Sequence, residues 1–160
     1  MSGEVVIGVI PNAKIKMGMF KTKRYTLVFT SYRLLLAEAR DDLVKAEVER
    51  ARAAAKAQGS GFFGQWGAQL KVKFGPHYLT VAPDSILAET PGNGALTPAD
   101  VRSLRIEKKQ KDDGDDSMIP YLRVTIEATT GKFEFETDDE EPRVDDARRM
   151  AASVFGPVVR

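Results

Sequence analysis

Five basic side chains lie close together near the start of the chain, and apolar residues separate several of them. The basic residues are Lys14, Lys16, Lys21, Lys23 and Arg24. A lysine ammonium offers a point charge to a phosphate oxygen, whereas an arginine guanidinium can hold two oxygens of one phosphate group. Segment 14–24 is therefore a candidate site for an anionic lipid head group, with Met19 and Phe20 able to enter the membrane interface beside it. A solvent-facing strand, where lysines discourage aggregation at a sheet edge, is the favoured interpretation of the same pattern.

A cluster of large apolar residues in the middle of the chain is the second candidate site. Its members are Phe62, Phe63, Trp66, Leu70 and Phe74. From Phe63 onward the spacings of three and four place four of them on one side of a helix, although Gly64 and Gly67 weaken that helix. The cluster either packs the middle of the chain onto the rest of the fold or forms an exposed patch that contacts a partner.

The remaining side chains with chemical potential do not form a recognisable catalytic or metal-binding pattern. His77 is the single histidine and the chain has no cysteine. The aspartates of 112–116 surround a glycine, but an EF-hand loop starting at Asp112 would place Ser117 at its sixth position and Arg123 at its twelfth, where glycine and glutamate are needed. Motifs of serine hydrolases, P-loop proteins, dinucleotide-binding proteins and zinc proteases are also missing. We therefore expect a protein that is not an enzyme and has no cofactor, catalytic residue or metal site.

Length and charge fit one domain with an uneven charge distribution. The 160 residues predict a single domain over 1–160, and the net charge is +1. Residues 1–80 carry 13 Lys and Arg against 6 Asp and Glu, whereas residues 81–160 carry 11 against 17. This asymmetry indicates either an anionic partner for the first half or two regions that attract each other.

The apolar stretches are too short to cross a membrane. None approaches the roughly 20 consecutive apolar residues of a spanning helix. The run Val5–Ile10 has no basic residue before it, which favours a first strand over a signal peptide, so we expect a cytoplasmic protein.

Strand patterns occupy the first quarter of the chain. Val5–Ile10 and Ile15–Phe20 are two predicted strands separated by a turn at Pro11 and Asn12. Tyr25, Leu27 and Phe29 alternate with the β-branched residues Thr26, Val28 and Thr30, which predicts a strand. An apolar run follows at 34–37, which predicts a tight hairpin around 31–33.

A largely helical segment follows, over about 41–91. We predict a helix over 42–58 that ends at Gly59, a short helix within 62–75, a helical turn over 83–89 that begins with Pro83, and a loop over 91–94. The narrow Val and Ala stripe of the first helix would suit pairing with another helix, either within this segment or in a second copy of the chain.

The last third combines strands with one final helix. A strand is predicted around 104–107, followed by a solvated loop over 108–117 and a hairpin over 121–136 that turns at Thr130 and Gly131. An amphipathic helix over 142–155 ends at Gly156, and it must bury its apolar stripe, most simply at an open end of the sheet.

The order of these elements resembles that of pleckstrin-homology-like domains, including the GRAM group. Residues 21–35 look like the second and third strands of that family, with Thr30-Ser31-Tyr32-Arg33-Leu34 at its "T-x-x-R-L" turn. Segment 96–104, LTPADVRSL, is similar to the family's "I-P-x-x-D-I-x-S-V", and the hairpin and final helix supply the closing elements. The helical insertion at 41–91 departs from a minimal domain of the family.

The resemblance implies an α+β fold in which a strongly bent antiparallel sheet, roughly a barrel, is capped by the C-terminal amphipathic helix. It also implies a binding or scaffolding module without catalysis. In lipid-binding members of the family, basic residues around the loop between the first two strands hold head-group phosphates, and Lys21, Lys23 and Arg24 occupy the matching stretch here.

Three functions follow in order of preference. The first is a non-catalytic module that contacts a protein partner or another copy of itself, giving a homo-oligomer, through the inserted helices and the aromatic residues of 62–74. The alternative is peripheral binding to an anionic membrane surface through the basic segment 14–24. Nucleic-acid binding is the least favoured, because the net charge is near zero and the second half is acidic.

Overall fold

A sheet of seven antiparallel strands dominates the structure, a computed structural model that describes residues 3–16, 22–40, 45–46, 49–50, 53, 76–112, 114 and 117–160. The strands are β1 (Val6–Lys16), β2 (Thr22–Thr30), β3 (Leu34–Glu38), β4 (Gly94–Leu96), β5 (Val101–Asp112), β6 (Met118–Ala128) and β7 (Gly131–Glu136). The helices are α3 (Pro83–Glu89) and α4 (Val144–Phe155), with short 3-10 helices η1 (Pro76–Thr80) and η2 (Gly156–Val158). The predicted α+β class, the antiparallel sheet and the C-terminal helix are confirmed.

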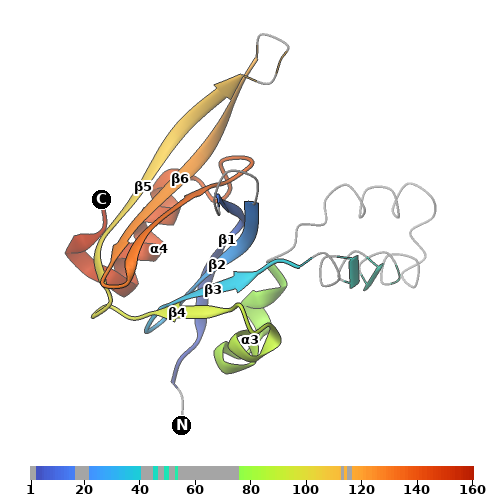
Figure 1. Cartoon of the computed structure of the whole chain (residues 1–160), viewed down its shortest axis with the longest axis vertical. Helices are drawn as coiled ribbons and strands as arrows, with labels where there is room; N and C mark the ends of the chain where they lie inside the picture. The colour runs from blue at the N-terminus through green and yellow to red at the C-terminus, as the bar shows by residue number, and fades with distance from the viewer. Residues whose placement is uncertain are drawn as a thin grey trace.

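Two groups of strands form the sheet, in the order β4-β3-β2-β1-β7-β6-β5. Each group runs up and down with strands consecutive in sequence, and β1 joins them by pairing with β7 through Lys14 and Glu136. Figure 1 shows β5 and β6 running steeply across the direction of β3 and β4. Within the described strands, β4 and β5 are the two ends of the sheet, and they do not pair with each other.

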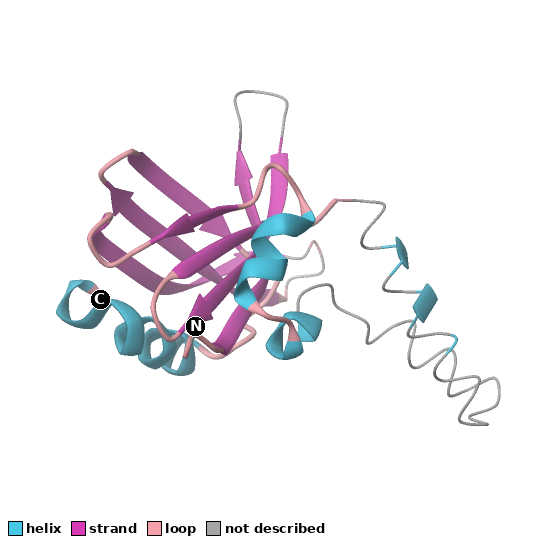
Figure 2. Cartoon of the chain, turned by 90° about the horizontal axis from the view of Figure 1, so that it is seen from below, coloured by secondary structure: helices cyan, strands magenta, loops and turns pink. Residues whose placement is uncertain are grey.

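Side-chain alternation gives the first group of strands two buried faces. Leu27 and Phe29 of β2 lie in the larger core, which α4 covers, whereas Val28 points to a second core with Tyr78 of η1 and Ile86 of α3. This period of two is what the sequence predicts for β2, and burial on both faces accounts for its nearly continuous apolar run. Figure 2 shows the strands rising over α4, which lies along one side of the sheet.

The prediction of two N-terminal strands separated by a turn is wrong. Residues 6–16 form one strand, and its pairing with β2 shifts register between Ile10 and Ala13. Asn12 adopts a φ of 58° at this irregularity. Proline lacks the N–H that a regular ladder needs and asparagine tolerates a left-handed conformation, so Pro11 and Asn12 suit a bulge within a strand as well as a turn between strands. The part of the predicted second strand beyond Lys16, residues 17–20, lies outside the described residues.

The prediction of a loop over 108–117 is also wrong for residues 108–112, which belong to β5. Strand β5 continues to Asp112 and stays in register with β6, from Lys108 opposite Leu122 to Asp112 opposite Met118. The polar side chains of this stretch misled the prediction, because Gln110, Lys111 and Asp112 at the end of the ribbon are all exposed and show no buried face. Figure 1 shows this ribbon extending beyond the other strands.

Both predicted hairpins are present, and one strand was missed. Residues 31–33 connect β2 and β3 tightly, and Thr129 and Thr130 connect β6 and β7. The three residues of β4 fall partly in the predicted loop over 91–94. A strand this short carries too few residues to display a period.

Helix α4 confirms the amphipathic pattern at the C-terminal end. Ala147, Ala151 and Phe155 are buried, and the Phe155 ring meets Phe29 of β2 edge-on at 6.5 Å between centroids. The helix ends where Gly156 adopts a φ of 68°, as its glycine predicts. The helix packs on β5, β2 and β1, along the buried face of the sheet.

The segment predicted as a helical insertion, 41–91, lies between β3 and β4, and the structure describes part of it. Helix α3 begins with Pro83, in agreement with the prediction. Of the helix predicted over 42–58, residues 45–46, 49–50 and 53 are described and helical, and the others lie outside the described residues, as does the helix predicted within 62–75. Among the described helices, none has both the length and the apolar character to cross a bilayer.

Candidate functional site

The turn that carries the "T-x-x-R-L" pattern is an internal hydrogen-bonded unit. The Thr30 hydroxyl accepts hydrogen bonds from the backbone N–H groups of Tyr32 and Arg33 at 3.1 and 3.0 Å and donates one to the Glu4 carboxylate at 2.6 Å. The Arg33 guanidinium binds both oxygens of Glu4, at 2.8 and 3.0 Å. Hydrogen bonding to Glu4 is the main cause that raises the pKa of Arg33. These polar groups therefore attach the N-terminal segment to the hairpin and are not available to a ligand.

The second family-like segment also forms a local turn. The Asp100 carboxylate accepts hydrogen bonds from the backbone N–H and the hydroxyl of Thr97, both at 2.9 Å. These bonds, the backbone one first, lower the pKa of Asp100. The turn leads from β4 into β5, and the Asp100 carbonyl accepts from Thr129 N–H at 2.8 Å. Its polar groups position strands, so the candidate binding residues are to be found elsewhere.

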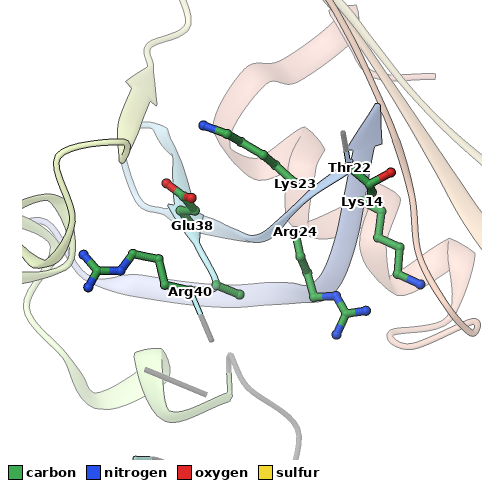
Figure 3. A pocket seen from close by; sticks show the side chains of 7 residues that line it. Lys14, Thr22, Lys23, Arg24, Glu38 and Arg40 are labelled. Carbon is green, nitrogen blue, oxygen red and sulfur yellow. The ribbon is translucent and has the colours of Figure 1, made fainter. Parts of the chain in front are cut away.

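The basic residues of β1 and β2 lie where β1 ends and β2 begins, a region that we call the basic end of the sheet. Lys14 lies directly opposite Arg24 in the strand pairing, and Lys16 lies opposite Thr22. Residues directly opposite each other share a face of the sheet, so Lys14 and Arg24 are neighbouring cations. Figure 3 shows their side chains pointing to the same side, whereas Lys23 and Glu38 point together toward the other. Of the five predicted residues, Lys21 lies outside the described residues.

Two neighbouring hollows border this cationic pair. The first has a volume of about 700 Å³ and is lined by Lys14, Thr22, Lys23, Arg24, Glu38, Ala39 and Arg40. The second has a volume of about 650 Å³, lies where β1 separates from β7, and includes Lys14, Lys16, Thr22, Lys132, Glu134 and Asp138 in its lining. Lys14 and Thr22 line both hollows. The first hollow has four cationic residues against one acidic residue, so it is the better place for an anion.

The charged residues near the basic end of the sheet form two separate sets of ion pairs. The Lys14 ammonium lies 2.6 Å from the Asp138 carboxylate, and the two side chains keep 38% and 41% of their surface exposed. On β6, Arg123 lies 3.6 Å from Glu134 and 3.7 Å from Glu136. The pair between Lys14 and Asp138 joins the basic half of the sequence to its acidic half, which is one of the two explanations expected for the charge asymmetry.

The predicted protein-contact residues have no described geometry. Phe62, Phe63, Trp66, Leu70 and Phe74 all lie outside the described residues. His77 is half-buried in η1, with its ring centroid 4.1 Å from that of Tyr78. Of the described side chains, no group of three or more His, Asp or Glu could hold a metal ion.

Arg40 and Asp138 belong to the basic end of the sheet but were not predicted there. Arg40 could have been found from the sequence, because a tight β2–β3 hairpin places residues equally distant from its turn side by side. The backbone confirms this placement, since Ala39 N–H donates to Arg24 C=O at 2.8 Å. Asp138 could not have been found in this way, because its approach to Lys14 depends on the pairing of β1 with β7, two strands far apart in sequence.

Comparisons with known proteins give no relative: no protein-family model, curated protein or solved structure matches the chain. The chemistry of the site must therefore be argued from its own residues. Lys14 and Arg24 present an ammonium and a guanidinium on one face of the sheet beside an open hollow. Such an arrangement can bind oxygens of a phosphate or of another compact anion.

Proposed function

We propose that this chain is a non-catalytic, pleckstrin-homology-like binding module that binds a phosphate-bearing anion on the face of β1 and β2 that carries Lys14 and Arg24. The strand order supports the likeness in fold, since two up-and-down groups of strands are followed by a helix that packs on the sheet. We include in this proposal a strongly bent, barrel-like sheet that is capped by α4. Both family-like segments form turns that position strands, which agrees with a role for these motifs in the fold.

The observation that carries the proposed function is the register of β1 and β2, which sets Lys14 directly opposite Arg24. Like charges directly opposite each other in a sheet reduce stability, so an anion that bridges them would relieve this cost as well as gain hydrogen bonds. Lys23 and Arg40 add positive charge along the lining of the same hollow. The guanidinium of Arg24 supplies the two-pronged donor that a phosphate group accepts best.

A calorimetric titration with inorganic pyrophosphate, together with co-sedimentation on vesicles, tests this function. The Arg24→Gln variant is expected to bind pyrophosphate about tenfold more weakly than the wild type, a difference of about 1.4 kcal/mol. Arg102→Gln is the matched control, because Arg102 is exposed on β5 and lies outside both hollows. Equal binding by the wild type and both variants would refute the proposed site.

The vesicle arm distinguishes the source of the phosphate. Phosphatidylcholine vesicles with and without phosphatidylserine are compared at low and high salt, because attraction to an anionic surface is screened by salt. Sedimentation that needs phosphatidylserine and depends on Arg24 would assign a lipid head group. Pyrophosphate binding without sedimentation would assign a soluble phosphate compound.

Binding to a protein partner, or to a second copy of the chain, stays a prediction. It depends on the aromatic residues of 62–74, which lie outside the described residues. Nucleic-acid binding remains the least favoured function, because β7, beside the second hollow, carries Glu134 and Glu136 as well as Lys132.

A further inference from the structure

The Asp138 carboxylate holds one of the two cations on which the proposed anion site depends. Its Oδ1 atom lies 2.6 Å from the Lys14 ammonium, two residues after the end of β7. Lys14 is also the residue of β1 that pairs with β7, opposite Glu136. The ion pair therefore lies at the junction of the two strand groups and at the boundary between the two hollows.

We infer that Asp138 is an intramolecular competitor for the anion site, because its carboxylate occupies the Lys14 ammonium that a phosphate oxygen would bind. This inference rests on the proposed function and adds to it a residue that sets its affinity. Three observations support it: the short distance, the shared face of Lys14 and Arg24, and the exposure of both members of the ion pair.

The exposure of the pair makes it a displaceable contact. With 38% and 41% of their side-chain surfaces in contact with water, Lys14 and Asp138 form an ion pair of the kind that contributes little to stability. A phosphate group carries more negative charge than one carboxylate and can reach Arg24 at the same time. Release of Lys14 from Asp138 is therefore a small cost that the ligand can overcome.

The neighbouring acidic side chains are not equivalent to Asp138. Glu134 and Glu136 pair with Arg123 of β6. Glu38 lies against Gly92, where an added Cβ would collide with its carboxylate, and it points to the opposite side from Lys14 in Figure 3. Asp138 is thus the acidic residue for which the structure gives a direct contact with Lys14.

Replacement of Asp138 by the uncharged asparagine tests the inference in the pyrophosphate titration. Asp138→Asn is expected to tighten binding about fivefold, because Lys14 is released and the repulsion of the anion by the carboxylate is removed. The matched control is Asp146→Asn, which makes the same change in net charge on an exposed side chain of α4. The control is expected to change affinity less than twofold. Thermal unfolding of each variant checks that the fold is intact.

A second variant separates the ion pair from general charge. In a Lys14→Gln background, Asp138→Asn is expected to lose most of its effect, since no ammonium remains to be released. If Asp138→Asn and Asp146→Asn have equal effects while Arg24→Gln still weakens binding, the competitor is refuted and the proposed function stands. If pyrophosphate binds neither the wild type nor Asp138→Asn, both proposals fail. Binding that appears only in Asp138→Asn would support a strong competitor.

Discussion

Replacement of Arg33 by alanine is expected to destabilise the protein by breaking the contact between its N-terminal segment and the β2–β3 turn. Arg33 holds both oxygens of Glu4, at 2.8 and 3.0 Å, and its own side chain is 23% exposed. The Glu4 side chain is only 9% exposed, so alanine at position 33 would leave a nearly buried carboxylate without its cation. The second carboxylate near Arg33, Asp84, is 88% exposed and adds little.

The magnitude follows from these exposures. Hydrogen bonds to charged groups contribute about 1.5–3 kcal/mol each, and removal of one partner from a fully buried ion pair costs about 3–5 kcal/mol. Exposed pairs contribute about 0–1 kcal/mol. Because the Glu4–Arg33 pair lies between these limits, we expect a loss of about 2–3 kcal/mol in the free energy of unfolding. For a chain of this length that corresponds to a decrease in Tm of about 5–10 °C.

Urea unfolding followed by circular dichroism measures this loss. Arg33→Lys, which keeps the charge but not the two-pronged contact, is expected to lose about half as much stability as Arg33→Ala. Arg149→Ala is the control, because its ion pair with Asp146 is exposed on α4, and it is expected to cost less than about 0.5 kcal/mol. A double-mutant cycle with Glu4→Gln isolates the pair itself. The reasoning is refuted if Arg33→Ala is no more destabilising than Arg149→Ala while the slope of the unfolding free energy against urea concentration is the same for both variants.

Three further predictions concern other parts of the chain. A hydrogen bond from Val144 N–H is the main cause that lowers the pKa of Glu140, so its ionised form stabilises the folded chain at neutral pH and this contribution is lost as the pH falls below about 4.5. Tm measured against pH should therefore fall less steeply for Glu140→Gln, and equal slopes would contradict this. Gly8→Ala should destabilise by about 1 kcal/mol, because the new Cβ meets the Met150 sulfur and this flexible side chain must move aside. A Gly8→Ala, Met150→Ala double variant should lose less than the sum of the two. Deletion of 42–75 should alter the oligomeric state in light scattering or the partners captured by the chain, and if neither changes, the predicted protein-contact role of the aromatic cluster is wrong.

Local sequence patterns were sufficient for the elements that follow a regular period. The alternation over 25–30 predicts β2, and the three- and four-residue spacing from Val144 to Val154 predicts α4. In α4 the period reflects burial of one face, and in β2 it reflects side chains that alternate between two cores. The Thr30–Arg33 turn was recognisable because its residue types are needed for its own hydrogen bonds.

Features that depend on partners distant in sequence were not predictable in this way. Proline and asparagine are common both in bulges and in turns, so Pro11 and Asn12 do not distinguish the two. The pairing of β1 with β2 shows that here they form a bulge. The polar strand after Ile106 is defined by its pairing with β6, since its charged side chains show no buried face. The contact between Lys14 and Asp138 depends on a strand junction that brings together residues more than a hundred positions apart.

The position of the insertion has a practical consequence for fusion proteins. The chain leaves β3 and re-enters the sheet at β4, two strands that pair directly, with Leu36 opposite Gly94. Ala39 on the outgoing side and Tyr78 on the returning side pack in the same apolar cluster. Because the entropic cost of closing a loop rises slowly with its length, a fluorescent reporter whose own ends are close together could replace residues 41–75 with little strain on the sheet. Such a chimera would carry its label on the side of β3 and β4.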